Sequence, residues 1–201
     1  MKLSKVLAAA VILLLPAHVA RAQVQGMPFY PTPTGMGVLV SADYANPGNS
    51  QSVLALRGGV GFGPFGVTAL VGQYKVSGFS SQTLFGASAA MKLFGGGLMP
   101  VSISAQAGVG QLKVSSVFGS TTVTSFPVGA AIRANVPLFP LKPFAVGYYV
   151  LGNSNVKKEF RVTVGADFNL LLGLGVHAAY DMGSQNTWGV GAHFNFRMPV
   201  M

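Results

Sequence analysis

The chain has 201 residues, no cysteine, and 13 Lys or Arg against 4 Asp or Glu, for a formal net charge of +9. The lack of cysteine excludes a small secreted scaffold held together by disulfides, and the basic residues are scattered along the chain, which argues against nucleic acid as a partner. Half of the residues are hydrophobic, but no apolar run after the first segment reaches the length of a membrane helix, so a helical membrane bundle is disfavoured.

The first 22 residues have the pattern of a secretory signal peptide. Lys2 and Lys5 make a basic start, residues 6–15 are apolar, and Ala20-Arg21-Ala22 is a small-x-small cleavage site. The apolar run is shorter than the roughly 20 residues of a membrane-spanning helix. We therefore expect an exported protein with one domain, in which 23–35 is a short periplasmic segment and 198–201 a C-terminal extension.

From residue 36 onward, bulky apolar side chains alternate with small or polar ones. This period of two predicts β-strands whose two faces meet different surroundings. Pro127, inside one of these segments, cannot donate to a strand ladder and predicts a β-bulge. We expect ten strands, or eight if the first strand and a C-terminal hairpin are miscounted; the ten lie at about 36–45, 51–62, 65–75, 82–94, 101–113, 122–136, 143–151, 159–169, 173–181 and 187–197.

Aromatic residues concentrate near the strand ends of the apolar face, as in the aromatic girdles of outer-membrane barrels. A soluble β-sandwich, the alternative fold, would place its aromatics in the middle of the strands. We expect one girdle of Tyr44, Phe85, Phe126, Tyr148, Phe160, Tyr180 and Trp188, and a second of Phe62, Phe65, Phe144, Phe168, Phe194 and Phe196.

This pattern resembles the small outer-membrane β-barrel proteins of Gram-negative bacteria, the broad OmpA-like and OmpW-like class. The resemblance implies an all-β, antiparallel up-and-down barrel over residues 36–197, embedded in outer-membrane lipid. It also implies insertion by the barrel-assembly machinery, which reads a C-terminal aromatic residue. Phe196 is that residue in this chain, and residues 197–201 follow it.

The small or polar face would line the lumen, and basic residues outnumber acidic ones there. One interpretation is a narrow pore that attracts small anions. The other is a structural network in which arginines pair with carboxylates and plug the barrel. The lumen residues that we expect are Arg57, Lys92, Arg133, Arg161, Asp167, His177, Asp181, His193 and Arg197.

Enzymatic and metal chemistry are not expected, and no cofactor is implied. His177 and His193 fall on one face of adjacent strands, but a metal ion needs a third ligand, so we expect water-bridged histidines instead. A lipid-modifying barrel enzyme is the alternative, yet His177 and Asp181 lie four residues apart on a strand, too far for a catalytic pair. Self-association is a further alternative, because small residues on the lipid face permit close approach, namely Ala87, Ala89, Ala105 and Ala107.

Overall fold

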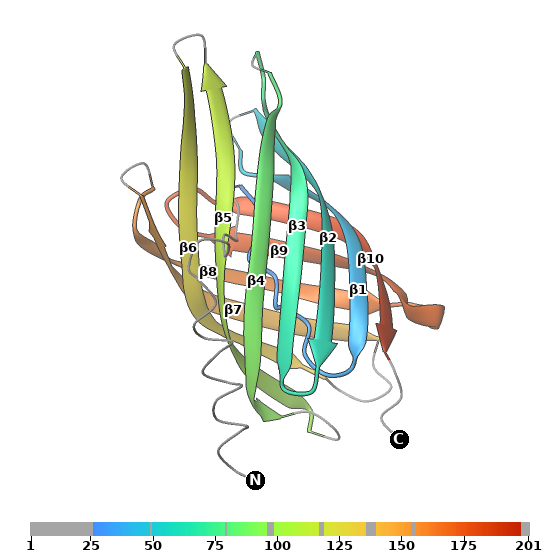
Figure 1. Cartoon of the computed structure of the whole chain (residues 1–201). Helices are drawn as coiled ribbons and strands as arrows, with labels where there is room; N and C mark the ends of the chain where they lie inside the picture. The colour runs from blue at the N-terminus through green and yellow to red at the C-terminus, as the bar shows by residue number, and fades with distance from the viewer. Residues whose placement is uncertain are drawn as a thin grey trace.

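The computed structural model describes residues 26–48, 50–78, 80–95, 99–116, 119–135, 140–153 and 156–197, which form a closed antiparallel β-barrel (Figure 1). The expected signal peptide at 1–22 and the extension at 198–201 lie outside these residues. The strands are β1 (Gly37–Asn46), β2 (Gln51–Phe62), β3 (Phe65–Val76), β4 (Gln82–Gly95), β5 (Val101–Ser116), β6 (Gly119–Ala134), β7 (Leu141–Gly152), β8 (Glu159–Asn169), β9 (Leu174–Met182) and β10 (Thr187–Arg197).

Each strand pairs with its neighbours in sequence, and β1 pairs with β10 to close the barrel. The ten-strand prediction is confirmed, and the eight-strand alternative is wrong. A short 3-10 turn at Leu171–Gly173 precedes β9. No helix in the described part of the chain is long and apolar enough to cross a membrane.

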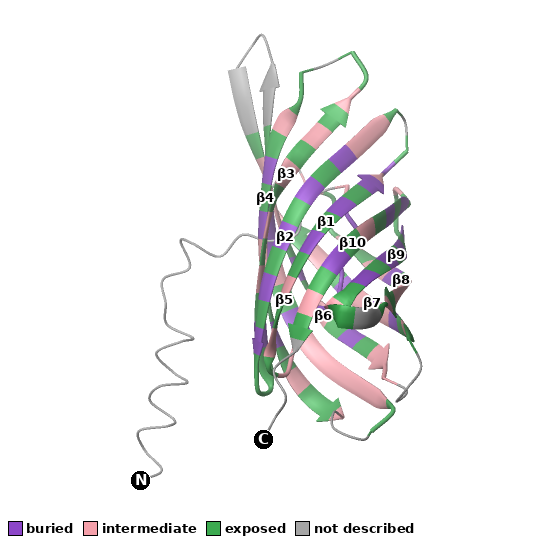
Figure 2. Cartoon of the chain, turned by 90° about the vertical axis from the view of Figure 1, so that its right-hand side faces the viewer, coloured by how far each residue is buried: buried purple, intermediate pink, exposed green. Residues whose placement is uncertain are grey.

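The connections lie at the two ends of the barrel. We call the end with the β1–β2, β3–β4, β5–β6, β7–β8 and β9–β10 connections the loop end, and the opposite end the turn end. Burial alternates along the strands (Figure 2), with large apolar side chains exposed on the outer face. The expected girdle aromatics that point outward are Tyr44, Phe62, Phe65, Phe85, Phe126, Phe160, Phe168, Tyr180, Trp188, Phe194 and Phe196.

The expected girdle positions of Phe144 and Tyr148 are wrong, because both rings are buried inside the barrel. On β7 the alternation is inverted: the inward side chains are Phe144, Val146 and Tyr148, whereas Tyr149 is exposed. The register explains the inversion, since Tyr148 is paired with the inward-facing Arg161 of β8. Apolar residues on both faces of β7 made the sequence pattern ambiguous.

The bulge expected at Pro127 is also wrong. The β5–β6 register is the same on both sides of this proline, which only interrupts the paired ladder. The register shift that the structure does show lies between Lys92 and Phe94, in the pairing of β4 with β5. A missing N–H is therefore accommodated here without an extra residue.

The inverted face of β7 can be tested with the single tryptophan of the chain. In chain refolded into lipid vesicles, Trp188 faces outward and is expected to be quenched by brominated lipids. In a Trp188→Phe background, tryptophan at position 149 should be quenched in the same way, and tryptophan at position 148 should not. Equal quenching at the two neighbouring positions would contradict the β7 assignment.

Candidate functional site

Residues 26–36, which we call the lumen segment, run lengthwise through the interior of the barrel (Figure 1). Gly26 lies beside the side chain of Pro47, in the β1–β2 connection at the loop end. At the turn end, the backbone N–H of Gly35 donates to the carbonyl of Gly63 at 2.9 Å. The segment therefore spans the barrel from one mouth to the other.

This placement corrects the expectation of a periplasmic segment at 23–35, of which 26–35 is described. The reason is physical: Met27, Phe29 and Tyr30 are apolar or aromatic and are at most 7% exposed. Burial of such side chains stabilises the fold by roughly 1.5–3 kcal/mol each. The aromatic content of the segment was the sequence signal for burial.

Wall side chains satisfy the backbone of the lumen segment, which is not part of a strand ladder. The N–H of Phe29 donates to Thr163 Oγ1 at 3.2 Å, and the N–H of Thr32 donates to Gln106 Oε1 at 3.2 Å. The Thr32 hydroxyl also bonds to the Ser88 hydroxyl, with 2.6 Å between the oxygens. The segment is thus bonded to three different parts of the wall.

Edge-to-face ring contacts and one cation–π contact hold the middle of the lumen segment. Phe29 meets Tyr148 edge-on with ring centroids 5.0 Å apart, and Tyr30 meets Phe144 at 6.3 Å. The guanidinium carbon of Arg57 lies 4.2 Å from the Tyr30 ring centroid, a cation–π distance. The two β7 rings that were expected to face lipid therefore pack on the lumen segment.

Glycines in the wall make room for the segment. A Cβ on Gly66 would overlap the carbonyl oxygen of Pro33, and a Cβ on Gly61 would lie 2.6 Å from the carbonyl oxygen of Gly35. The small inward-facing residues of the wall thus leave space in the lumen, and residues 26–36 fill it.

A buried polar cluster lies beside the seam where β1 closes on β10. Asp43, with no exposed surface, forms an ion pair with Arg57 (Nε to Oδ2, 3.1 Å) and accepts a hydrogen bond from His177 (Nε2 to Oδ1, 2.8 Å). Arg57 Nε also donates to Ser41 Oγ at 3.1 Å, and this hydroxyl donates to Asp43 at 3.2 Å. The carboxylate is therefore satisfied from β1, β2 and β9 together.

The two histidines are in direct contact, which corrects the expectation of a water bridge. Their rings stack with centroids 5.4 Å apart, and His177 Nδ1 lies 3.2 Å from His193 Nδ1. Their backbone positions are diagonal in the β9–β10 register, as expected. Gly191 makes the approach possible, because a Cβ there would lie 2.6 Å from His177 Nε2.

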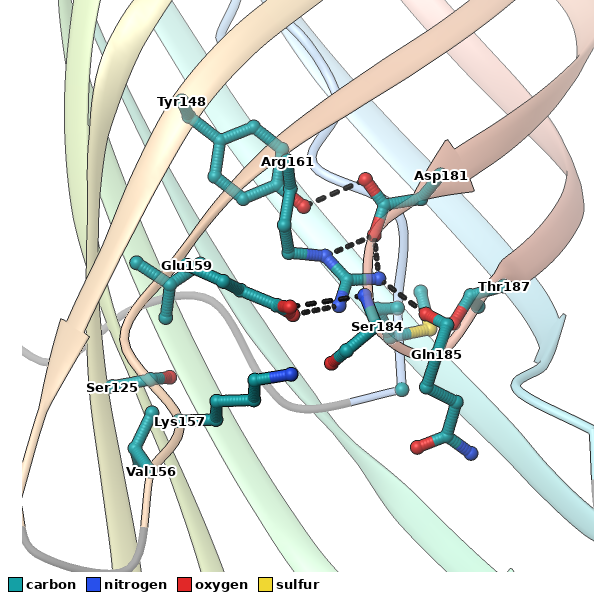
Figure 3. A pocket seen from close by; sticks show the side chains of 13 residues that line it. Ser125, Tyr148, Val156, Lys157, Glu159, Arg161, Asp181, Ser184, Gln185 and Thr187 are labelled. Atoms are coloured by element: carbon teal, nitrogen blue, oxygen red, sulfur yellow. Dashed lines mark hydrogen bonds and ion pairs between the residues drawn. The ribbon is translucent and has the colours of Figure 1, made fainter.

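At the loop end, a cavity of about 100 Å³ opens above the lumen segment (Figure 3). Arg161 donates to Asp181 Oδ2 (Nε, 2.8 Å), to Glu159 Oε1 (Nη1, 2.6 Å) and to the carbonyl of Gln185 (Nη2, 2.7 Å). Arg161 and Asp181 are diagonal neighbours in the β8–β9 register, in which Asp181 is directly opposite Thr163. Lys157 also lines this cavity.

Asp181 connects this cavity to the lumen segment. Tyr148 and Thr163 each donate a hydroxyl hydrogen bond to Asp181 Oδ1 at 2.7 Å. Thr163 in turn accepts the Phe29 N–H. The ion pairs at the loop end and the segment therefore belong to one hydrogen-bonded network.

At the turn end, Arg133 pairs with Asp167 at 3.1 Å. Lys92 faces inward and is half-buried, whereas the side chain of Arg197 lies outside the described residues. All four acidic residues of the chain are thus paired, with Arg57 and His177, with Arg133, or with Arg161. Among the lumen cations expected from the sequence, Arg57, Arg133 and Arg161 are neutralised.

The geometry gives no support to the hydrolase alternative. Within the described residues, His177 contacts Asp43, Arg57, Tyr30 and His193, and none of these is a serine. The backbone N–H of Ser184, the serine that follows His177 and Asp181 in sequence, donates instead to Glu159 at the loop end. Among the residues that the structure describes, no serine hydroxyl bonds to His177 or His193 as a nucleophile would to its base.

The small residues considered for self-association do lie together on the outer face. Ala89 is paired with Ala107, and Ala87 and Ala105 flank them on β4 and β5. Close approach of a second barrel at this place stays a prediction.

No protein-family model and no curated protein sequence matches the chain. Among solved structures it is similar to the N-terminal β-barrel domain of Pseudomonas aeruginosa OprF, with 12% identity, 82% of this chain and 100% of that chain covered, and a TM-score of 0.44. It is also similar to the β domain of the Bordetella autotransporter BrkA, with 15% identity, 82% and 99% covered, and a TM-score of 0.45.

Two glycine substitutions test whether the lumen segment lies against the barrel wall at Gly66. Gly66→Ala is expected to lower the free energy of unfolding by about 1–3 kcal/mol, because the new methyl group overlaps Pro33. Gly58→Ala is the control, since its Cβ would meet nothing within 4 Å. Urea unfolding in detergent micelles measures both. Equal stability of the two variants would show that residues 26–36 do not occupy this place.

Proposed function

We propose that the chain is a bacterial outer-membrane barrel whose lumen is closed by its own residues 26–36. In the resting state its role is structural, and permeation requires the lumen segment to be displaced. The observation that carries this proposal is the course of the segment from mouth to mouth, bonded to Thr163, Gln106 and Ser88 on the way.

The outer surface supports residence in a membrane. Large apolar side chains such as Leu54, Phe160 and Phe168 are exposed on a closed ladder that leaves no free strand edge. A soluble monomer rarely exposes a continuous apolar surface of this kind, whereas a closed barrel satisfies every backbone group within lipid. Outer-membrane lipid and the barrel-assembly machinery are the partners that this proposal requires.

An opened lumen would favour anions only modestly. Ion pairs with carboxylates cancel the charges of Arg57, Arg133 and Arg161. Lysines border the lumen at both ends, Lys92 and Lys142 at the turn end and Lys157 at the loop end. Positive side chains in a low-dielectric lumen raise the local concentration of anions.

Planar-bilayer recordings test the closed state. The unmodified chain should show rare conductance steps or none. In the double variant Phe29→Ala, Tyr30→Ala, loss of ring and cation–π contacts worth roughly 2 kcal/mol should raise the open population about 30-fold. Phe85→Ala, which truncates an outward ring, is the matched control and should stay closed.

Selectivity is measured in the same recordings from the reversal potential in a salt gradient. We expect a modest preference for anions that falls in Lys92→Gln. A wild-type chain that conducts as often as the double variant would contradict the closed state. Cation preference in the opened variant would contradict the expected preference for anions and would leave the closed state untouched.

A further inference from the structure

We propose that His177, His193 and Asp167 bind a divalent transition-metal ion of the zinc class in the lumen. The three residues come from β9, β10 and β8, and each offers one ligand atom, all within 4.8 Å of one another. Imidazole nitrogen and carboxylate oxygen are ligands that zinc takes in proteins. The two histidines alone offer too few ligands for a metal ion, and Asp167 is the third.

The two histidines are already spaced as ligands of one ion. Two nitrogens that bind a tetrahedral zinc at about 2.0–2.1 Å are roughly 3.3 Å apart. The Nδ1 atoms of His177 and His193 are 3.2 Å apart. Asp167 is directly opposite His177 in the β8–β9 register, and its carboxylate offers an oxygen within 4.8 Å of the ligand nitrogens of both histidines.

Asp43 orients the His177 ring by a hydrogen bond to Nε2, on the side of the ring away from the proposed ion. It accepts a hydrogen bond from His177 Nε2 at 2.8 Å, which places the proton on Nε2 and leaves the lone pair of Nδ1 facing His193. A carboxylate behind a histidine ligand in this manner is a common support of zinc sites. Asp43 is itself fixed by Arg57 and Ser41, so His177 is held in the ligating orientation before any ion binds.

The lumen has room for a fourth ligand. The two histidines and Asp167 border a cavity of about 20 Å³, which Asn169 and Asn195 also line. This volume is enough for one water molecule, and the amides offer it hydrogen-bond partners. A site with three protein ligands and one water follows from the geometry.

Three cationic side chains that line the same cavity oppose the charge of the ion, namely Arg57, Arg133 and Lys142. Arg133 holds Asp167 Oδ2, which leaves the second carboxylate oxygen for the metal. Arg57 lies 3.4 Å from His177 Nε2, farther than the Asp43 oxygen at 2.8 Å. The carboxylates are therefore the nearer groups, and removal of a positive charge should strengthen binding.

The chain allows a clean experiment, because its histidines are His18, His177 and His193 and it has no cysteine. We would refold the untagged full chain with His18→Gln in detergent and titrate it with Zn²⁺ by calorimetry. Cobalt(II) in place of zinc gives an absorption spectrum that reports coordination by the protein. We expect a single ion per chain and a visible cobalt spectrum.

Variants separate the ligands from their support. His193→Gln should weaken binding at least 100-fold, and Asp43→Asn should weaken it about 10- to 100-fold, as loss of such a support does elsewhere. Arg133→Gln should tighten it. Heat-modifiable migration on gels would verify that each variant is folded, and Arg133→Gln keeps the test decisive if another variant fails to fold.

Two results would overturn the proposal. One is folded chain that takes up no zinc at micromolar concentration and gives no cobalt spectrum, so that the histidines share only a hydrogen bond. The other is zinc uptake that His193→Gln leaves unchanged. Neither result depends on whether the lumen conducts, so the metal site and the closed lumen can fail separately.

Discussion

The structure depends on filling the interior of a barrel that is wider than its own wall side chains can occupy. Barrels of about eight strands are just wide enough for side chains to fill, and this one has ten strands lined in part by glycine and alanine. Residues 26–36 occupy much of the remaining space and bring Phe29 and Tyr30 into contact with β7. The middle of the lumen is therefore packed by the protein's own residues.

The same constraint explains the polar network. Charged groups in the lumen are removed from most of the surrounding water, so each buried carboxylate needs a partner. Asp43 and Asp181 each accept from several side chains on different strands. Asp43 does so beside the β1–β10 seam, where pairing of the first and last strands closes the barrel. Pairing of β1 with β10 therefore brings the partners of Asp43 together, and their bonds to Asp43 in turn stabilise the closed barrel.

Much of the fold was predictable from the sequence, and the site only in part. The alternation gives all ten strands, because its period is set locally by the pleat. The inward face of β7 was not predictable, since Phe144 and Tyr148 are as apolar as lipid-facing residues and only the β7–β8 register decides their direction. The contact of His177 with Asp43 depends on barrel closure, and its place opposite Asp167 depends on the β8–β9 register, neither of which a single segment encodes.

One cross-link can test whether residues 26–36 lie within the barrel. Thr32 and Ser88 have hydroxyl oxygens 2.6 Å apart, close to the S–S bond length of about 2.05 Å, and the chain has no native cysteine. Oxidation of the double variant Thr32→Cys, Ser88→Cys in bacterial membranes should give a nearly complete intramolecular disulfide. The double variant Thr32→Cys, Ala87→Cys, with its second cysteine on the outer face, should give none. Absence of the first disulfide, or equal yields from both pairs, would contradict the account.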